Sequence, residues 1–383
     1  MNEKKKILIL NYLFPPLGGG GGVASYTIAK GFIQAGYDVD YITTWYTGLK
    51  TFEIVDGISV YRVRVIGRGN MATASLLSLV SYPFCALLRG VKLCLRNKYV
   101  LINSHFVVPT GPLGFFLSKV FKIKHVISIH GGDIYNPTKK ISPHRHKFLQ
   151  MVITFLLNHA DSIIAQSADT RENCIKYYEP NKEIEIIPLP YESASFASIT
   201  KHELGLHEDK KYMIGIGMLV PRKGFDVFIK ALVRLDESVH GVIIGSGPEL
   251  DRLKLLAHEL GISARLHLVG YISDEKKWHY LSHADVFVLS SIHEGFGIVL
   301  QEAMQVGLPI VATNYGGQTD FIIDGKNGFL VPPGDEIALA DKVDEILNSK
   351  EIALRMKLSN FETIKKFSNE AFIKKLFHSL SYE

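Results

Sequence analysis

The 383-residue sequence predicts an α/β protein made of two doubly wound domains in tandem, each a parallel sheet covered by helices. Three observations support this prediction. Short apolar runs alternate with helical patterns along the first half of the chain, one segment interrupts the alternation, and the alternation then begins again. Alternating strands and helices produce parallel sheets with helices on both faces. The length fits two domains, because single cores rarely grow beyond about 250–300 residues.

The first domain is expected to span residues 1–190. Helical patterns lie near residues 23–35, 74–96, 109–121, 143–158 and 168–178. The apolar runs between them predict strands at Ile7–Tyr12, Val39–Thr43, Val100–Asn103, Val126–Ile129, Ser162–Ala165 and Ile184–Ile187.

The second domain is expected to span residues 211–367, after a linker at residues 191–210 that is rich in Ser, Ala and charge. The last segment, residues 368–383, is predicted to be a helix that packs back on the first domain. Two such domains are expected to face a ligand-binding cleft. The strands predicted for the second domain are Met213–Ile216, Gly241–Ile244, Leu266–Val269, Val286–Leu289 and Ile310–Ala312.

The formal net charge of +5 is distributed unevenly along the chain. Residues 1–190 contain 22 Lys and Arg against 12 Asp and Glu, a net charge of +10, and the remainder carries −5. A basic first half suggests an anionic partner such as a phosphorylated acceptor, a lipid phosphate or an anionic membrane surface. The alternative is a solvated basic face with no partner. Nothing in the sequence indicates nucleic-acid binding.

The cysteines and the apolar segments predict a cytoplasmic protein, peripheral on the membrane if it binds one. The apolar run at residues 7–14 is short and ends in two prolines and five glycines, so it is expected to be a strand rather than a signal peptide. Arg89 and Lys92 interrupt the apolar stretch at residues 72–95, so no membrane span is expected. No CxxC pair or Cys/His cluster is formed by Cys85, Cys94 and Cys174.

The most informative segment is His293–Met304, with the sequence HEGFGIVLQEAM. A predicted strand ends before it, and a helix is expected to begin near Gly297. Amides at a helix N-terminus, with glycines that allow close approach, suit a diphosphate. Glu302 lies about five residues into that helix, roughly 7–8 Å along its axis, which suits ribose hydroxyls. Glu294 precedes the helix, where it could face a sugar. Alternatively, both are surface acids.

The segment Glu294–Gly334 resembles the signature of the family-4 retaining glycosyltransferases, which have the GT-B fold of two Rossmann-like domains facing a cleft. The likeness rests on E-x7-E, GLPIVAT from Gly307, Gly316-Gly317 and DGKNGFLVPPG from Asp324. The resemblance implies that Glu294 contacts the donor sugar and Glu302 the ribose. It also implies that the backbone amides at Phe296, Gly297 and Ile298 bind the sugar and phosphates.

A second segment of the resemblance, Gly217–Gly224, follows the first strand of the second domain. By the resemblance, Lys223 neutralises the leaving diphosphate. The family usually has an arginine where this chain has Met218, which cannot donate a hydrogen bond. Arg222 is the candidate substitute, although adjacent side chains often point apart. The alternative for Arg222 is a surface charge.

In the first domain, the resemblance draws attention to loops after three strands. The glycine-rich loop, residues 18–22, permits close backbone approach to an oxygen-rich group. The resemblance implies that Gly19 and Gly20 lie near the donor phosphate and Gly21 near the acceptor. His130, in His-Gly-Gly-Asp, is expected to face the donor sugar. His105 could border the acceptor, or could be incidental.

Two further motifs match parts of known ligand-binding signatures. Asp38-Val39-Asp40 matches a D-x-D metal motif but enters a predicted strand, so no metal role is expected. Gly245-Ser246-Gly247 lacks the third glycine of a dinucleotide site and is expected to line the nucleotide cleft. By the resemblance, the backbone at Gly270 and Tyr271 reads the base.

The expected activity is metal-independent, retaining transfer of a hexose or N-acetylhexosamine from a nucleoside-diphosphate sugar, with no cofactor. A UDP-sugar is favoured and GDP-mannose remains open. The expected acceptor is a glycan, or a lipid-linked or phosphorylated molecule. Two rivals remain: a nucleotide-sugar epimerase or hydrolase of the same fold, and a nucleotide-sugar-binding protein without turnover.

Overall fold

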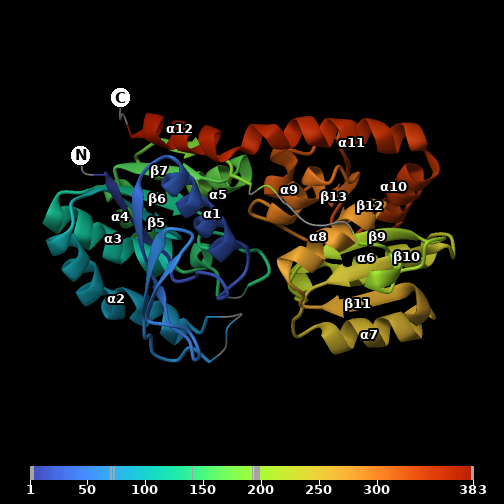
Figure 1. The fold of residues 1–383 in the computed structure, drawn as a ribbon, viewed down its shortest axis with the longest axis horizontal. Coiled ribbons are helices and arrows are strands. Elements are labelled where there is room, and N and C mark those ends of the chain that lie inside the picture. Colours follow the sequence, from blue (N-terminus) through green and yellow to red (C-terminus); the bar gives the residue numbers. More distant parts are fainter. Residues whose placement is uncertain are drawn as a thin grey trace. The chain divides into compact units, whose positions relative to one another are not determined.

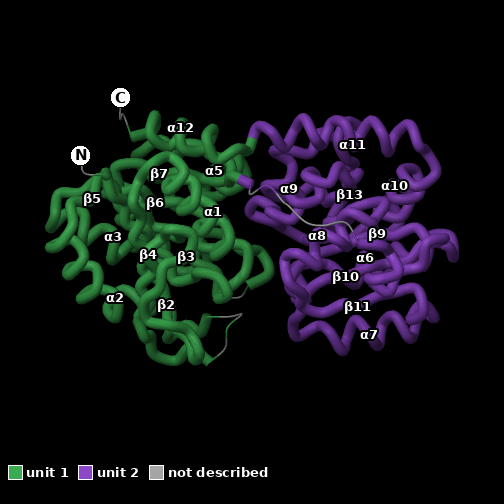
Figure 2. Tube along the Cα trace, in the orientation of Figure 1, with its two compact units in different colours: residues 1–190, 367–383 green, residues 191–366 purple. Residues whose placement is uncertain are grey.

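The computed structural model describes residues 4–69, 71, 74–139, 141–191, 193 and 199–380. The chain forms two compact units (Figure 2). Unit 1 comprises residues 1–190 together with 367–383, and unit 2 comprises residues 191–366. In both units helices surround a central β-sheet (Figure 1).

Unit 1 has an eight-stranded sheet in the order β3-β4-β2-β1-β5-β6-β7-β8, parallel except for the β3–β4 pair. The strands are β1 (Lys6–Leu10), β2 (Asp38–Thr44), β3 (Phe52–Val55), β4 (Ile58–Val63), β5 (Tyr99–His105), β6 (Lys124–Ile129), β7 (Ser162–Ala165) and β8 (Ile184–Ile186). The helices are α1 (Gly20–Gln34), α2 (Leu76–Arg96), α3 (Val107–Phe121), α4 (Lys147–His159), α5 (Ala168–Tyr178) and α12 (Asn369–Ser379), with a short 3-10 turn at Pro143–Arg145.

The hairpin β3–β4 was not among the predicted strands. Its two-residue turn is Asp56-Gly57, and both residues have positive φ, at 46° and 82°. Asp-Gly between short apolar segments favours this kind of hairpin turn, since the mirror-image turn matches the twist of the strands. The signal was therefore present in the sequence and was missed.

The two faces of the unit 1 sheet are covered by different helices. Ile42 of β2 packs with core side chains of α2 and α3. The preceding residue, Tyr41, packs on Phe14, and its hydroxyl hydrogen-bonds to Ser25 of α1 at 2.6 Å. Because successive strand residues point to opposite faces, α1 covers one face while α2 and α3 cover the other.

The C-terminal helix α12 belongs to unit 1 and packs against α1. Asn369 donates a hydrogen bond from Nδ2 to Oε1 of Gln34 at 3.1 Å, and the Phe377 ring stacks on Tyr37 with centroids 5.1 Å apart. Lys124 of β6 donates to the carbonyl of Leu380 at 2.9 Å. These contacts place the end of the chain on the domain that contains its beginning.

Unit 2 has a six-stranded, fully parallel sheet in the order β11-β10-β9-β12-β13-β14. The strands are β9 (Lys211–Ile216), β10 (Val239–Ile244), β11 (Leu266–Gly270), β12 (Val286–Leu289), β13 (Ile310–Thr313) and β14 (Phe329–Val331). The helices are α6 (Phe225–Arg234), α7 (Leu250–Glu259), α8 (Asp274–His283), α9 (Ile298–Gln305), α10 (Glu336–Asn348) and α11 (Lys350–Ile364), with 3-10 turns at His202–Leu204, Pro221–Lys223, Ser263–Arg265 and Gly317–Asp320. A further 3-10 turn, Lys365–Phe367, spans the boundary in the chain between the two units.

Each sheet has a point where the winding direction changes. β1 lies between β2 and β5, and β9 lies between β10 and β12, so the chain winds outward both ways from β1 and from β9. Loops at the carboxyl ends of strands beside such a point diverge and leave room for a ligand. The predicted site residues lie there: Gly19 after β1, His105 at the end of β5, Lys223 after β9 and Glu294 after β12.

Candidate active site

The centre of the site in unit 2 is a carboxylate that binds two adjacent cations. Lys223 donates from Nζ to Oε1 of Glu294 at 2.5 Å, and Nη1 of Arg222 lies 3.1 Å from Oε2. Arg222 also donates to the carbonyl of His293 at 2.6 Å. The short 3-10 turn that contains both cations turns their side chains toward the same group. Arg222 is therefore part of this cluster rather than a separate surface charge.

The ionisation of Glu294 is governed by these neighbours. Burial by itself raises the pKa of Glu294, but the charges of Lys223 and Arg222 outweigh burial and hold the pKa well below its usual range. The Ser291 hydroxyl donates to Oε1 at 2.7 Å and adds to the same effect. Burial lowers the pKa of Lys223 while Glu294 opposes that shift. The short contacts favour an ionised cluster with one excess positive charge, which suits an anionic ligand.

The backbone around Glu294 is held by the glycine pair Gly316-Gly317. Gly317 donates its amide to the carbonyl of Glu294 at 2.8 Å. A Cβ on Gly316, whose φ is 118°, would lie 2.4 Å from that carbonyl oxygen. The glycines therefore allow the loop after β13 to pair directly with the loop after β12, which fixes the position of Glu294.

The helix α9 begins beside this cluster. Gly297 stands at its N-cap with φ 96°, and within the described chain no side chain caps the helix. The first amides of a helix have no intrahelical partner and favour an anion. The Phe296 side chain is buried against Phe321, with ring centroids 5.1 Å apart, so only its backbone faces the site.

Glu302 lies one turn into α9, and only one of its two carboxylate oxygens has a hydrogen-bond partner among the described residues. Its Oε1 accepts a hydrogen bond from Lys277 of α8 at 2.7 Å, whereas Oε2 is buried and has no hydrogen-bond partner among the described residues. Burial raises the pKa of Glu302, and Lys277 offsets part of that rise. A buried carboxylate oxygen without a donor is costly, so Oε2 is suited to accept from a ligand hydroxyl.

The loop after β9 explains several glycines of unit 2. A Cβ on Gly217 would lie 3.0 Å from Cε of Lys223, so the glycine leaves room for the lysine side chain to pack beside the backbone. A Cβ on Gly245 would lie 1.8 Å from the carbonyl oxygen of Gly217, and one on Gly247 would lie 2.3 Å from that of Leu219. The motif Gly245-Ser246-Gly247 thus supports the loop that carries Lys223. Met218 in that loop is half-buried.

The base-reading segment predicted at Gly270 and Tyr271 ends β11. Gly270 has φ 80° and its carbonyl accepts from the amide of Gly245 at 2.9 Å. Tyr271 is 82% exposed in this structure. The segment is thus tied to the same loop system as the cations.

In unit 1, the predicted residues His105 and His130 contact each other. Nδ1 of His105 and Nε2 of His130 are 2.9 Å apart, and the ring centroids of Phe106 and His130 are 4.5 Å apart. Burial lowers the pKa of His130 to about 4 and that of His105 well below its usual value. Both imidazoles are therefore neutral at pH 7. The His105 side chain contacts His130 and is fully buried, so it offers no surface to an acceptor.

Asp133, which follows both histidines in the sequence, completes this group. Its Oδ2 accepts from the amide of Val107 at 2.8 Å and its Oδ1 from the amide of His130 at 3.0 Å. Burial raises the pKa of Asp133 to about 6, against the lowering effect of these amides. The carboxylate joins the loops after β5 and β6 and so fixes the backbone of His130.

The glycine loop, residues 18–22, differs from expectation. The helix begins earlier than predicted: Gly20 and Gly21 lie in the first turn of α1, and Gly19 is its N-cap. A Cβ on Gly21 would lie 2.4 Å from Cζ of Phe106. The glycines therefore let the start of a helix, rather than a free loop, approach the aromatic ring beside the histidine pair.

The D-x-D motif forms a structural contact. Asp40 is buried, forms a salt bridge with Lys6 at 3.0 Å and accepts a hydrogen bond from Tyr99. Throughout the described ranges, no group of three or more His, Cys, Asp or Glu residues is arranged to hold a metal ion.

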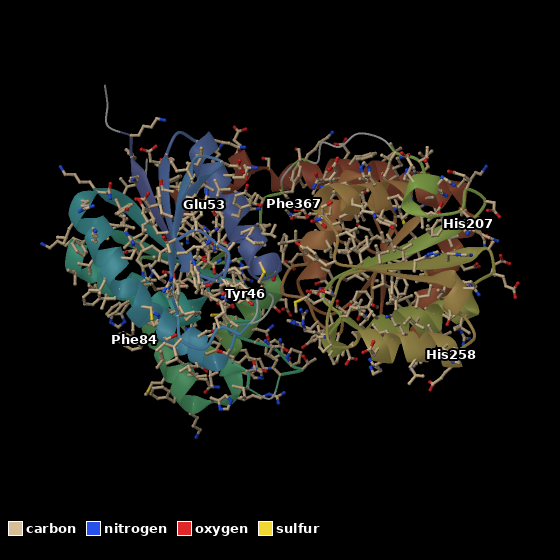
Figure 3. All side chains as sticks on the ribbon, turned by 60° about the horizontal axis from the view of Figure 1, so that its bottom comes forward. Tyr46, Glu53, Phe84, His207, His258 and Phe367 are labelled. Carbon is tan, nitrogen blue, oxygen red and sulfur yellow. The ribbon has the colours of Figure 1, made fainter. Side chains whose placement is uncertain are left out.

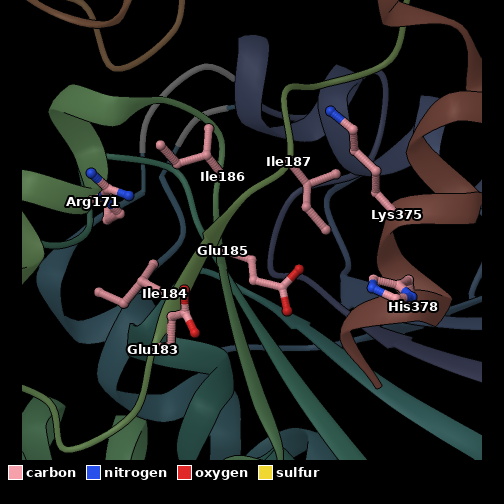
Figure 4. Close-up of a pocket in the computed structure, with 8 residues that line it drawn as sticks. All are labelled: Arg171, Glu183, Ile184, Glu185, Ile186, Ile187, Lys375 and His378. Carbon is pink, nitrogen blue, oxygen red and sulfur yellow. The ribbon is translucent and has the colours of Figure 1, made fainter. Parts of the chain in front are cut away.

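A cavity of about 340 Å³ lies elsewhere in unit 1, along β8 and between α5 and α12 (Figure 4). Arg171, Glu185, Lys375 and His378 contribute polar groups to its lining. None of the predicted site residues lines it.

Three residues of the site carried no sequence signal: Lys277, Ser291 and Phe106. Each touches a predicted residue from a different element, namely α8, the loop after β12 and the loop after β5. Lys277 and Phe106 contact residues 25 and 24 positions away, so a linear motif does not reveal them, whereas Ser291 lies three residues before Glu294 and is revealed only by the direction of its hydroxyl.

Comparison with known proteins agrees with this arrangement. The family model described as glycosyltransferase family 4 matches residues 18–193, and the one described as glycosyl transferases group 1 matches residues 198–362. The 2-deoxystreptamine N-acetyl-D-glucosaminyltransferase of Niallia circulans is 26% identical over 368 residues, covering 91% of this chain and 94% of that protein.

Solved structures show the same fold. The sucrose-phosphate synthase of Thermosynechococcus elongatus matches with a TM-score of 0.86 at 22% identity, over 98% of this chain and 99% of that one. HepE of Anabaena, in complex with UDP-glucose, matches with a TM-score of 0.76 at 20% identity, over 98% and 99%. The predicted two-domain α/β class is confirmed. The chain belongs to the group 1 glycosyltransferases, with an N-terminal part of glycosyltransferase family 4, and it has the GT-B fold.

Proposed function

We propose that this glycosyltransferase moves a hexose or N-acetylhexosamine from a UDP-sugar to an acceptor, with retention of the anomeric configuration and without a metal ion. The observation that carries the proposal is the convergence of Arg222 and Lys223 on Glu294 beside the uncapped start of α9. Two cations and a helix N-terminus supply the positive charge that a leaving diphosphate needs.

The arrangement of the charged side chains suggests how the donor binds. Before the donor binds, Glu294 balances the two cations and holds them in place. A diphosphate at the start of α9 competes for the same cations, so Lys223 and Arg222 shift part of their interaction to the phosphates. Glu294 then remains beside the sugar, where the family signature implies its role. The ribose binds Oε2 of Glu302, which is the acceptor atom left without a partner.

The choice of donor is supported by the relatives. The Niallia enzyme is named for transfer of N-acetyl-D-glucosamine, and the Anabaena structure contains UDP-glucose. The proposal of retention is supported by the resemblance of Glu294–Gly334 to the retaining signature. In that scheme the acceptor attacks the face from which the diphosphate leaves, and the leaving phosphate takes the acceptor's proton. His130, neutral at pH 7, would orient the donor sugar by hydrogen bonding.

The proposal is tested by incubating the protein with UDP-glucose, UDP-N-acetylglucosamine and GDP-mannose, each with soluble and lipid-linked acceptors. Transfer should be detected with a UDP-sugar, persist in EDTA, and give an α-linked product by NMR. Loss of activity in EDTA would overturn metal independence, and a β-linked product would overturn retention. Donor hydrolysis or epimerisation without transfer would favour the rival enzyme classes. Nucleotide binding without any turnover would favour a binding protein.

A further inference from the structure

One side of unit 1 presents an apolar surface that no described part of the unit covers. On α2, large hydrophobic side chains recur at spacings of three, four, four and seven residues, so they form one stripe along the helix. Phe84 is 73% exposed and Leu88 is 83% exposed; Phe84 is labelled in Figure 3. The stripe consists of Leu77, Val80, Phe84, Leu88 and Leu95, each more than half exposed.

The same surface continues over the two neighbouring helices. α2 packs on α3 so closely that a Cβ on Gly90 would lie 2.8 Å from Cδ1 of Leu117. α3 packs on α4 through Phe115 and Phe155, whose ring centroids are 5.2 Å apart. Further exposed apolar side chains on these helices are Phe116, Val120, Phe148, Met151 and Phe155. We call this surface, α2 to α4, the apolar face.

The opposite side of α2 explains why the helix stays on the protein. By length and composition, α2 is apolar enough to cross a membrane, and a third of its most apolar window is buried. The buried side includes Tyr82, whose hydroxyl donates to the carbonyl of Ile42 at 2.9 Å, and Leu93 in the core with β1 and β5. The helix is thus fixed along the sheet by one face, while its outer face is also apolar.

The charges on the three helices of the apolar face have one sign. Residues 57–160 contain 14 Lys and Arg and one acid, Asp133, whose buried carboxylate accepts backbone amides. None of the helices α2, α3 and α4 contains an acidic residue. Exposed cations on or beside these helices are Lys92, Arg96, Lys119, Arg145 and Lys147. An apolar face whose own helices carry cations and no acids complements a negatively charged, apolar partner.

We propose that the apolar face docks unit 1 on the surface of an anionic phospholipid bilayer. A bilayer offers acyl chains to the apolar stripe and lipid phosphates to the bordering cations at the same time. A protein partner would need an extended acidic and apolar surface of its own to match both features. Docking is a property of the fold of unit 1 and does not depend on the donor or the reaction.

Flotation on a density gradient tests this directly, with the full chain and no nucleotide present. Vesicles of phosphatidylcholine alone are compared with vesicles containing about 30% phosphatidylglycerol, a level chosen to give a negative surface potential. The protein should float with the anionic vesicles. Binding should weaken as salt rises above about 0.1 M, where the screening length falls to about 10 Å.

The double variant Phe84→Glu/Leu88→Glu should bind anionic vesicles at least about tenfold more weakly, because two apolar contacts become two repelled charges. The matched control is Leu354→Glu/Leu358→Glu on α11 of unit 2. That pair has the same four-residue spacing and is 57% and 58% exposed. It adds the same charge, and it should float like the parent. Thermal unfolding of both variants checks that each is folded.

Three outcomes would overturn the proposal. The first is failure of the parent to float with anionic vesicles at low salt. The second is equal flotation of the parent and the Phe84→Glu/Leu88→Glu variant. The third is a dimer of the parent by light scattering that this variant converts to a monomer, which would assign the apolar face to a second copy of the chain. Each result is independent of whether sugar transfer is observed.

Discussion

Lys223 and Glu294 lie 71 residues apart in the sequence, yet Nζ of one donates to Oε1 of the other at 2.5 Å, and both side chains are nearly buried. Arg222 binds the second oxygen of the same carboxylate at 3.1 Å. The order of strands in the sheet explains this contact. β9 and β12 are neighbours, and the loops at their carboxyl ends carry Lys223 and Glu294.

Replacing Glu294 by Gln should destabilise unit 2 and strengthen its response to nucleotide. The change leaves two cations side by side without their carboxylate, and breaking a buried pair in this way costs about 3–5 kcal/mol. UDP should then raise the melting temperature of the variant more than that of the parent, while transfer falls at least about tenfold, the effect of losing one charged hydrogen bond.

Glu345→Gln is the control for this variant, since Glu345 forms an exposed pair with Lys342 and should change stability by less than about 1 kcal/mol. If UDP stabilised the Glu294→Gln variant no more than the parent, the cations would not be competing for phosphate.

Lys223→Ala and Arg222→Ala should both lower turnover strongly, with no rescue by magnesium. Each removes one of two cations from the phosphate site, a loss of about 1.5–3 kcal/mol for a charged hydrogen bond. Met218→Arg, which restores the family's usual residue, should partly rescue Arg222→Ala. The measurement is kcat with saturating donor, and full activity of Arg222→Ala would show that Arg222 acts only on Glu294.

Glu302→Ala should weaken binding of free UDP more than it affects the rate at saturating donor. Its Oε2 is the unpartnered acceptor proposed for ribose, and Oε1 is fixed by Lys277 at 2.7 Å. A loss of about tenfold in affinity is expected from one charged hydrogen bond. Calorimetry with UDP and with 2′,3′-dideoxy-UDP distinguishes the causes: the variant should bind the two nucleotides equally, whereas the parent should prefer UDP.

His105 should act through His130 rather than on the acceptor. His105→Ala should lower kcat with little change in the KM for acceptor, because it removes the hydrogen bond at 2.9 Å that fixes the His130 ring. His105→Asn, whose amide can still hydrogen-bond, should recover part of the loss. A rise in acceptor KM without a fall in kcat would instead restore the direct acceptor role.

Unit 1 should lose stability as the pH falls from 6.5 toward 4. Burial lowers the folded-state pKa of His125 and His130 to about 4, so the unfolded chain takes up protons first and is stabilised relative to the folded state. Each of these two histidines should lower the free energy of unfolding by about 2 kcal/mol at pH 5. Asp133 acts in the opposite sense, because burial raises its pKa to about 6 and the folded state then binds the proton more tightly.

His125→Gln tests this balance by removing one titrating group while an amide can still bond to Ser104. Urea unfolding of this variant should depend less on pH between 4 and 6.5 than that of the parent. The same slope in both proteins would show that His125 does not titrate on unfolding.

The sequence by itself determined the fold class and most of the strands. Buried parallel strands are short apolar runs, and the helices between them show a periodic pattern, so Ser162–Ala165 and Val286–Leu289 were placed at their observed bounds. The resemblance to the glycosyltransferase signature singled out Lys223, Glu294 and Glu302, and their roles toward a donor stay predictions.

Only the tertiary structure decided which side chains meet. The turn at residues 221–223 brings both Arg222 and Lys223 to one carboxylate. His105 could be placed at a strand end from sequence, but its burial against His130 depends on the neighbouring strand β6. The exposed stripe through Phe84 belongs to α2, whose sequence is largely apolar on more than one side. Which apolar face is buried depends on the sheet beneath it, and that contact is formed by residues far away in the chain.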